Sequence, residues 1–205
     1  MAQLEYPLTS LYLYLSGRCN LHCRHCWVAP SAPGEEYQVP LPDLKNCILT
    51  AKKLGMGAVK LTGGEPFLRH DIAELMTFLR DEGLCIDIES NGTLIDHNMA
   101  RLIRDCRVRQ VSISLDAAEP RQHEVLRGTS GVYEKTVAAI QYLCEEQVTT
   151  QVIMSLYNEN VSEIEPLAAR CEEWGIPSLK INFIMPTGRG EGVFERRENV
   201  SITVI

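Results

Sequence analysis

The chain alternates between short runs of apolar or β-branched residues and longer segments whose apolar residues recur at helical spacing. From the short runs we predict strands at residues 11–15, 58–61, 85–89, 110–115, 150–155 and 179–184. From the longer segments we predict helices at residues 41–54, 72–82, 96–105, 133–145 and 162–174. Such an alternation requires parallel strands joined by right-handed crossovers. The sequence therefore predicts an α/β domain built on a parallel sheet.

The number of strands narrows the fold further. Six strand–helix units are too few for a closed eight-stranded barrel, which takes about 250 residues. An open doubly wound sheet is an alternative, but the first predicted strand is followed by a cysteine loop and not by the glycine-rich phosphate turn of that fold. We expect an incomplete parallel (β/α)6 barrel over residues 1–190. Residues 191–205 are expected to form a loosely ordered tail, where a further domain would begin if the chain is truncated.

Composition excludes several classes of partner. The net charge of −7 argues against a nucleic-acid surface, which needs clustered Lys and Arg. No apolar stretch approaches the roughly 20 residues of a membrane span. Eight cysteines without a recognisable secretory signal indicate a reducing compartment. We expect a cytoplasmic protein without membrane or nucleic-acid partners.

Three cysteines, Cys19, Cys23 and Cys26, follow the first predicted strand at the spacing CxxxCxxC. Three thiolates can hold three irons of a [4Fe–4S] cube and leave the fourth iron open to a small molecule, whereas ferredoxin-type clusters use four cysteines. The same cysteines with His22 or His25 could form a Cys3His zinc site. The cysteines alone leave iron and zinc as alternatives.

A second motif, Thr62-Gly63-Gly64-Glu65-Pro66, follows the second predicted strand. Its two glycines let the backbone approach a ligand closely, Glu65 adds an anionic acceptor, and Pro66 stiffens the exit from the loop. Loops at the carboxyl ends of parallel strands share one face of the fold. The sequence therefore places this loop, which suits a ligand ammonium group, beside the cysteines.

Short polar side chains follow the next two predicted strands. Ser90 and Asn91 come after the third strand, and Ser114 and Asp116 end the fourth. They are suited to bind hydroxyl and other polar groups of a ligand. Ordinary capping of turns and helices is the alternative interpretation.

These motifs together resemble those of the radical S-adenosylmethionine (radical SAM) enzymes, over roughly residues 10–190. His25 stands where that family usually has an aromatic residue between its second and third cysteines. The resemblance implies the partial barrel, a [4Fe–4S] cluster and S-adenosylmethionine bound to the open iron. One electron from the cluster would cleave S-adenosylmethionine, and the resulting 5′-deoxyadenosyl radical would abstract hydrogen from a substrate.

The resemblance also implies roles for individual residues. Gly64 and Glu65 would hold the ammonium group of S-adenosylmethionine. Residues 123–128 resemble the family's HDxxRG segment, with Glu124 in place of the usual Asp, and Arg127 would there bind the ligand carboxylate. Its planar guanidinium suits such a contact.

Two further contacts to the ligand follow from the same resemblance. Ser114 and Asp116 resemble the family's polar contacts to ribose and methionine. Met185 lies in a segment that resembles the closing turn after the sixth strand, whose backbone would reach the adenine.

The substrate and partners are expectations from the resemblance as well. Residues 11–19 and the Cys26-Trp27 pair resemble those of maturases that modify ribosomally made peptides, which favours a peptide substrate. A small-molecule substrate, as in the molybdopterin or haem pathways, is the alternative. Either enzyme needs a one-electron reductant of the flavodoxin or ferredoxin type. A non-catalytic zinc module is the rival from another class of protein.

Overall fold

The computed structural model describes residues 6–28 and 38–200, and its strands form a single parallel sheet. The strands lie in the sheet in the order of the chain, so that the first and last form its two edges. They are β1 (Ser10–Tyr14), β2 (Ala58–Thr62), β3 (Cys85–Ser90), β4 (Gln110–Ser114), β5 (Thr150–Leu156) and β6 (Ser178–Phe183). This open sheet confirms the predicted α/β class and the incomplete (β/α)6 barrel.

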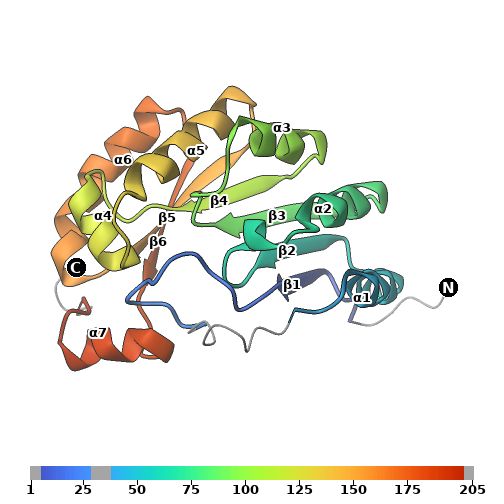
Figure 1. The fold of residues 1–205 in the computed structure, drawn as a ribbon, viewed down its shortest axis with the longest axis horizontal. Coiled ribbons are helices and arrows are strands. Elements are labelled where there is room, and N and C mark those ends of the chain that lie inside the picture. The colour runs from blue at the N-terminus through green and yellow to red at the C-terminus, as the bar shows by residue number, and fades with distance from the viewer. Residues whose placement is uncertain (1–5, 29–37, 201–205) are drawn as a thin grey trace.

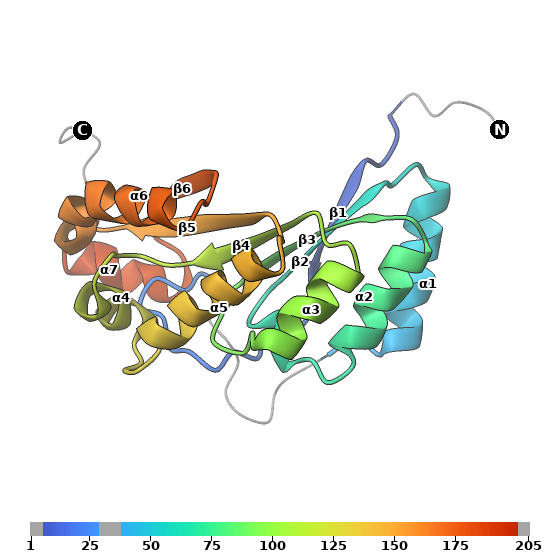
Figure 2. The ribbon, with the colours of Figure 1, turned by 90° about the horizontal axis from the view of Figure 1, so that it is seen from above.

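Helices connect successive strands, and Figures 1 and 2 show α1, α2, α3 and α5 along the same face of the curved sheet. The α-helices are α1 (Leu41–Lys53), α2 (Ile72–Asp81), α3 (His97–Asp105), α4 (Pro120–Arg127), α5 (Tyr133–Glu145), α6 (Ile164–Glu173) and α7 (Glu191–Glu195). The 3-10 helices in the described part of the chain are η1 (Pro66–Leu68), η2 (Asn158–Glu163) and η3 (Gly188–Gly190). Within the described ranges, no helix has the length and hydropathy needed to cross a membrane.

The two faces of the sheet differ in polarity. On β3, Ile86 and Ile88 are fully buried in the core, whereas Asp87 and Glu89, which point to the other face, are partly exposed. That second face carries polar contacts between strands, including one of 3.0 Å between Lys60 Nζ and a Glu89 carboxylate oxygen. Strands of a closed parallel barrel are apolar on both faces. The alternation seen here follows from a barrel that is open on its inner side.

The predicted strands and helices all exist, with ends that differ by at most two residues. Helix α4 was not predicted, although its signals are present: Pro120 stands in its first turn, and Gly128 ends it at a φ of 65°. The expectation of a loosely ordered tail is wrong for residues 191–195, which form α7 and bury Val193. After this helix, Glu198 forms an ion pair with Arg24. Residues 201–205 lie outside the described part.

One buried side chain joins the carboxyl ends of β4 and β5. Asn160 is fully buried and donates to the carbonyl oxygens of Asp116 at 2.9 Å and Ser155 at 3.0 Å. The side-chain oxygen of Asn160, Oδ1, accepts a hydrogen bond from the Tyr157 backbone amide at 2.8 Å. Because buried backbone groups need partners, this amide completes the hydrogen bonding of both strand ends.

We expect Asn160→Ala to lower the free energy of unfolding by about 3 kcal/mol, because it leaves buried donors and acceptors without partners. Chemical denaturation of the purified protein measures this loss. Asn158→Ala is the matched control, since that side chain is exposed and donates to one carbonyl oxygen, that of Arg197. It should cost no more than about 1 kcal/mol. Equal losses in the two variants would contradict the role given to Asn160.

Candidate functional site

The segment that follows β1, residues 16–28, contains no helix or strand, and we call it the cysteine loop. In Figure 1 it is the blue segment that passes between α4 and α7. Its cysteine side chains, Cys19, Cys23 and Cys26, border one cavity of about 160 Å³. None of the three forms a disulfide. The loop has no regular secondary structure, and its position depends on backbone hydrogen bonds to neighbouring loops.

The loop between β2 and η1 holds the first part of the cysteine loop. The Gly64 amide donates to the Ser16 carbonyl at 2.8 Å, and the Glu65 amide donates to the Arg18 carbonyl at 2.7 Å. A Cβ atom on Gly64 would lie 1.9 Å from the Arg18 oxygen. Only glycine therefore permits this approach of the two backbones.

Two other segments hold the rest of the cysteine loop. At the end of α4, the Arg127 carbonyl accepts from the His22 amide at 3.2 Å, and a Cβ on Gly128 would lie 2.4 Å from the His22 oxygen. At the turn after β6, the Arg189 amide donates to the Cys26 carbonyl at 3.0 Å. The Arg189 side chain donates to the Cys23 carbonyl at 2.8 Å. Three loops that are distant in sequence thus fix the backbone around the cysteines.

Most of the predicted ligand-binding residues border the same cavity. Besides the cysteines, those that do so are His25, Gly63, Gly64, Ser90, Asn91, Ser114 and Arg127. Four predicted residues are not among those that line it: Glu65, Pro66, Asp116 and Met185. Glu65, Pro66 and Asp116 are buried behind it, and Met185 is 62% exposed. The sequence motifs therefore meet at one place, but not every side chain in them faces the cavity.

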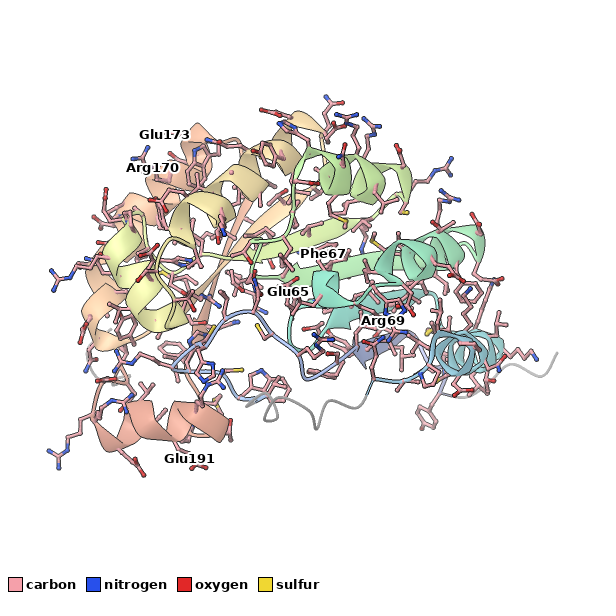
Figure 3. The ribbon with its side chains drawn as sticks, viewed as in Figure 1. Glu65, Phe67, Arg69, Arg170, Glu173 and Glu191 are labelled. Carbon is pink, nitrogen blue, oxygen red and sulfur yellow. The ribbon has the colours of Figure 1, made fainter. Side chains whose placement is uncertain are left out.

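The Glu65 carboxylate bonds inside the protein. It accepts hydrogen bonds from the amides of Phe67 at 3.2 Å and Asn91 at 2.9 Å, and from the Ser90 hydroxyl at 2.9 Å. Figure 3 labels Glu65 and Phe67 at the turn between β2 and α2. Burial raises the pKa of Glu65 to about 7, against the opposing effect of these three bonds. The side chain ties this turn to the end of β3.

Asp116 and Arg127 form a buried ion pair. Arg127 Nε donates to one Asp116 carboxylate oxygen at 2.6 Å, and Nη2 donates to the other at 3.0 Å. Burial by itself would raise the pKa of Asp116, but the Arg127 charge and His123 outweigh it and hold that pKa well below its usual range. Both groups are therefore charged, and the carboxylate occupies one edge of the guanidinium.

Burial and a nearby positive charge shift the pKa values of ionisable groups around the cavity. Burial raises the pKa of Cys19 to about 11 and raises that of Cys23, where the Arg127 charge acts in the opposite direction. Burial and the Arg127 charge lower the pKa of His25 to about 4, so its ring is neutral at pH 7. Such thiols release their protons when a metal ion binds to the sulfur.

The arrangement of the donor side chains bears on the choice between iron and zinc, which the sequence left open. Among residues 6–28 and 38–200, no three His, Cys, Asp or Glu side chains converge closely enough to hold one metal ion. A zinc site would need such convergence. Three sulfurs spread around a shared cavity fit a cluster, in which each thiolate binds its own iron.

Four other residues line the cavity and received no ligand role from the sequence: Thr62, Glu89, Trp27 and Val28. Thr62 and Glu89 follow the paired residues Leu61 and Ile88 on neighbouring strands, and the Thr62 hydroxyl donates to Glu89 at 3.1 Å. Their signal was the position at the carboxyl ends of adjacent parallel strands. The glycines and serines beside them match known motifs, whereas Thr62 and Glu89 are marked by this position alone.

Comparison with known proteins identifies the family. The family model for the radical SAM superfamily matches residues 13–171. The chain belongs to the radical SAM superfamily. Membership in the radical SAM superfamily implies S-adenosylmethionine and an iron–sulfur cluster as cofactors.

Two curated relatives show the range of this family. The chain is 30% identical over 177 residues to the AdoMet-dependent heme synthase of Methanosarcina barkeri, a match that covers 86% of this chain and 51% of that protein. It is 27% identical over 191 residues to the subtilosin biosynthesis protein AlbA of Bacillus subtilis, covering 92% of this chain and 42% of AlbA. The chain thus spans about half, or less, of the length of these relatives.

A solved structure shares the fold. The Streptococcus suis protein SuiB, crystallised with its precursor peptide SuiA, superposes with a TM-score of 0.79 at 20% identity. The match covers 96% of this chain and 42% of SuiB. At this identity the likeness shows a common fold.

We expect Gly64→Ala to displace the cysteine loop, because a Cβ there would meet the Arg18 carbonyl at 1.9 Å. The cost should be about 3 kcal/mol, as for overpacked cores, and iron incorporation should fall. Thermal unfolding and iron and sulfide analysis measure the two effects. The control is Gly57→Ala, where nothing lies within 4 Å of the new Cβ. A Gly64→Ala protein with unchanged stability and iron content would contradict this account.

Proposed function

We propose that this chain is the core of an enzyme that binds one [4Fe–4S] cluster through Cys19, Cys23 and Cys26. The enzyme cleaves S-adenosylmethionine reductively and abstracts hydrogen from a substrate, which we propose is a ribosomally made peptide. The observation that carries the proposal is the single cavity shared by the three cysteines, Gly63 and Gly64, and the polar ends of β3 and β4.

The chain's own residues prepare this cavity for both cofactors. The cysteine thiolates are ligands for iron, and water has limited access to them because Cys23 is buried and Cys19 and Cys26 are half-buried. Ser90, Asn91 and Ser114 offer hydroxyl and amide groups to a polar ligand beside the cysteines. When bound, the two cofactors supply one-electron cleavage chemistry that ends in hydrogen abstraction. A flavodoxin or ferredoxin type of protein would deliver the electron.

The proposed contacts of Glu65 and Arg127 to S-adenosylmethionine require an exchange of partners. Glu65 accepts three internal hydrogen bonds, and Asp116 occupies one edge of the Arg127 guanidinium. A ligand ammonium near Glu65 would favour its ionised form. We propose that the Gly63–Gly64 backbone and the residues lining the cavity make the first contacts, with Glu65 and Asp116 supporting them from behind.

Two features of the inner face support a peptide substrate. Exposed aromatic rings lie at the β1 edge beside the cavity: Tyr14 packs edge-on against Trp27 with ring centroids 5.4 Å apart, and Trp27 also lines the cavity. The sheet is open between its edge strands β1 and β6. An open side admits an extended chain, and aromatic rings at the entrance can pack against its side chains. AlbA, named for bacteriocin biosynthesis, supports the same choice.

A small aromatic molecule is the second candidate substrate. The match to a heme synthase at 30% identity favours it, since the same exposed rings would stack on a planar ligand. The polar groups on the inner face, including Lys60 and Glu89, are compatible with either substrate.

We expect Cys19→Ala, Cys23→Ala and Cys26→Ala each to abolish cluster binding and cleavage of S-adenosylmethionine, because the loss of one of three thiolates leaves an iron of the cube without its protein ligand. Iron and sulfide analysis after anaerobic reconstitution, with detection of 5′-deoxyadenosine, measures both. Cys47→Ala is the control, because Cys47 is exposed on α1. If reconstituted Cys23→Ala protein cleaved S-adenosylmethionine at the wild-type rate, the ligand assignment would be wrong.

We expect deuterium to pass from a labelled peptide substrate to 5′-deoxyadenosine, because the proposed enzyme abstracts hydrogen from the peptide. Mass spectrometry of reactions with deuterated peptides encoded near the gene measures the transfer, and unlabelled peptide is the control. Transfer from a labelled tetrapyrrole or nucleotide, with none from any such peptide, would favour the small-molecule alternative.

A further inference from the structure

The Arg127 side chain reaches the cysteines. It is 5% exposed, and its Nε and Nη2 atoms are held by the two Asp116 oxygens at 2.6 and 3.0 Å. Asp116 is itself fixed, because one of its oxygens also accepts from the Ser155 amide at 2.9 Å. A bidentate pair of this kind allows the guanidinium little freedom. Its orientation is therefore set before any cofactor binds.

The third nitrogen of this guanidinium points at a thiol. Asp116 holds the edge formed by Nε and Nη2, and the remaining atom, Nη1, lies 3.8 Å from Cys23 Sγ. Asp116 thus anchors the side of the guanidinium that is turned away from the sulfur. Cys19 Sγ has comparable donors in the Leu21 amide at 3.5 Å and Asn91 Nδ2 at 3.9 Å. Arg127 differs from these donors because it carries a full positive charge.

The same segment also supports Cys23 through its backbone. The Leu126 and Arg127 carbonyls accept from the Arg24 amide at 2.9 Å and the His22 amide at 3.2 Å, on either side of Cys23. The end of α4 therefore holds the segment around Cys23 through backbone hydrogen bonds and contacts the Cys23 sulfur through the Arg127 side chain. Partners of this kind orient the ligands of a metal centre and adjust its properties.

We propose that Arg127, locked by Asp116, is a positioning residue that donates to the Cys23 sulfur and raises the reduction potential of the iron–sulfur cluster. The inference rests on the proposed cluster ligands. One-electron reduction adds a negative charge to the cluster, and a donor to the sulfur stabilises that charge, more so when the donor is cationic and buried. The role differs from binding the carboxylate of S-adenosylmethionine, since it acts on the cluster through a cysteine.

The test compares midpoint potentials of reconstituted proteins, determined by redox titration monitored by electron paramagnetic resonance. The informative variant is Asp116→Asn/Arg127→Gln, which removes the ion pair without leaving one charge buried alone. We expect its ratio of reduced to oxidised cluster, at a fixed potential, to fall about tenfold, a shift of about 59 mV to more negative values for one electron. Arg127→Lys keeps the positive charge but loses the planar, bidentate guanidinium, and it should shift the midpoint potential less than the double variant does.

The control is Arg121→Gln, which removes the same charge from an exposed position on α4 and should leave the potential unchanged. Iron and sulfide content measured on each sample separates this inference from the proposed function. Wild-type protein without iron and sulfide would overturn the proposed function. A fully loaded double variant with the wild-type potential would overturn the inference about Arg127 alone.

Discussion

The structure depends on the close backbone contact between the cysteine loop and the loops that surround it. Residues 16–28 have no regular secondary structure, so their amides and carbonyls find partners on the β2–η1 loop, the end of α4 and the turn after β6. The contacts are closest at four glycines, Gly63, Gly64, Gly128 and Gly188, where any Cβ would lie less than 3.0 Å from a backbone oxygen of the cysteine loop. The cysteines are therefore held by three segments whose own positions are set by the parallel sheet.

A buried charge pair joins this loop to the core. Asp116 extends from the end of β4, Arg127 ends α4, and the pair bonds to β5 through the Ser155 amide and to the cysteine loop through Cys23. A buried ion pair contributes little net stability, because desolvation offsets the attraction, but removing one partner is costly. The pair fixes a position instead: Asp116 holds the Arg127 guanidinium beside the buried Cys23 thiol.

The open barrel explains the unusual polarity of the sheet. A closed parallel barrel buries both faces of its strands, whereas here the inner face carries Lys60, Glu89 and Gln151 in contacts between strands. This face continues into the cavity at the cysteines, where Glu89 and Thr62 stand at the strand ends. A polar inner face that remains accessible beside the proposed cofactors is suited to receive a substrate, and the exposed rings of Tyr14 and Trp27 lie at its edge.

The sequence by itself determined the α/β architecture, because the spacing of apolar residues distinguishes helices from strands and the two kinds of segment alternate along the chain. It also determined which loops meet, since parallel strands bring their carboxyl ends to one side. The tertiary structure decided where the side chains of those loops turn. Glu65 and Asp116 belong to motifs at the cavity, yet both turn inward, because a buried carboxylate needs donors and these come from Ser90, Asn91 and Arg127. The contact between Arg127 and Cys23 joins positions 104 residues apart, and only the folded chain brings them together.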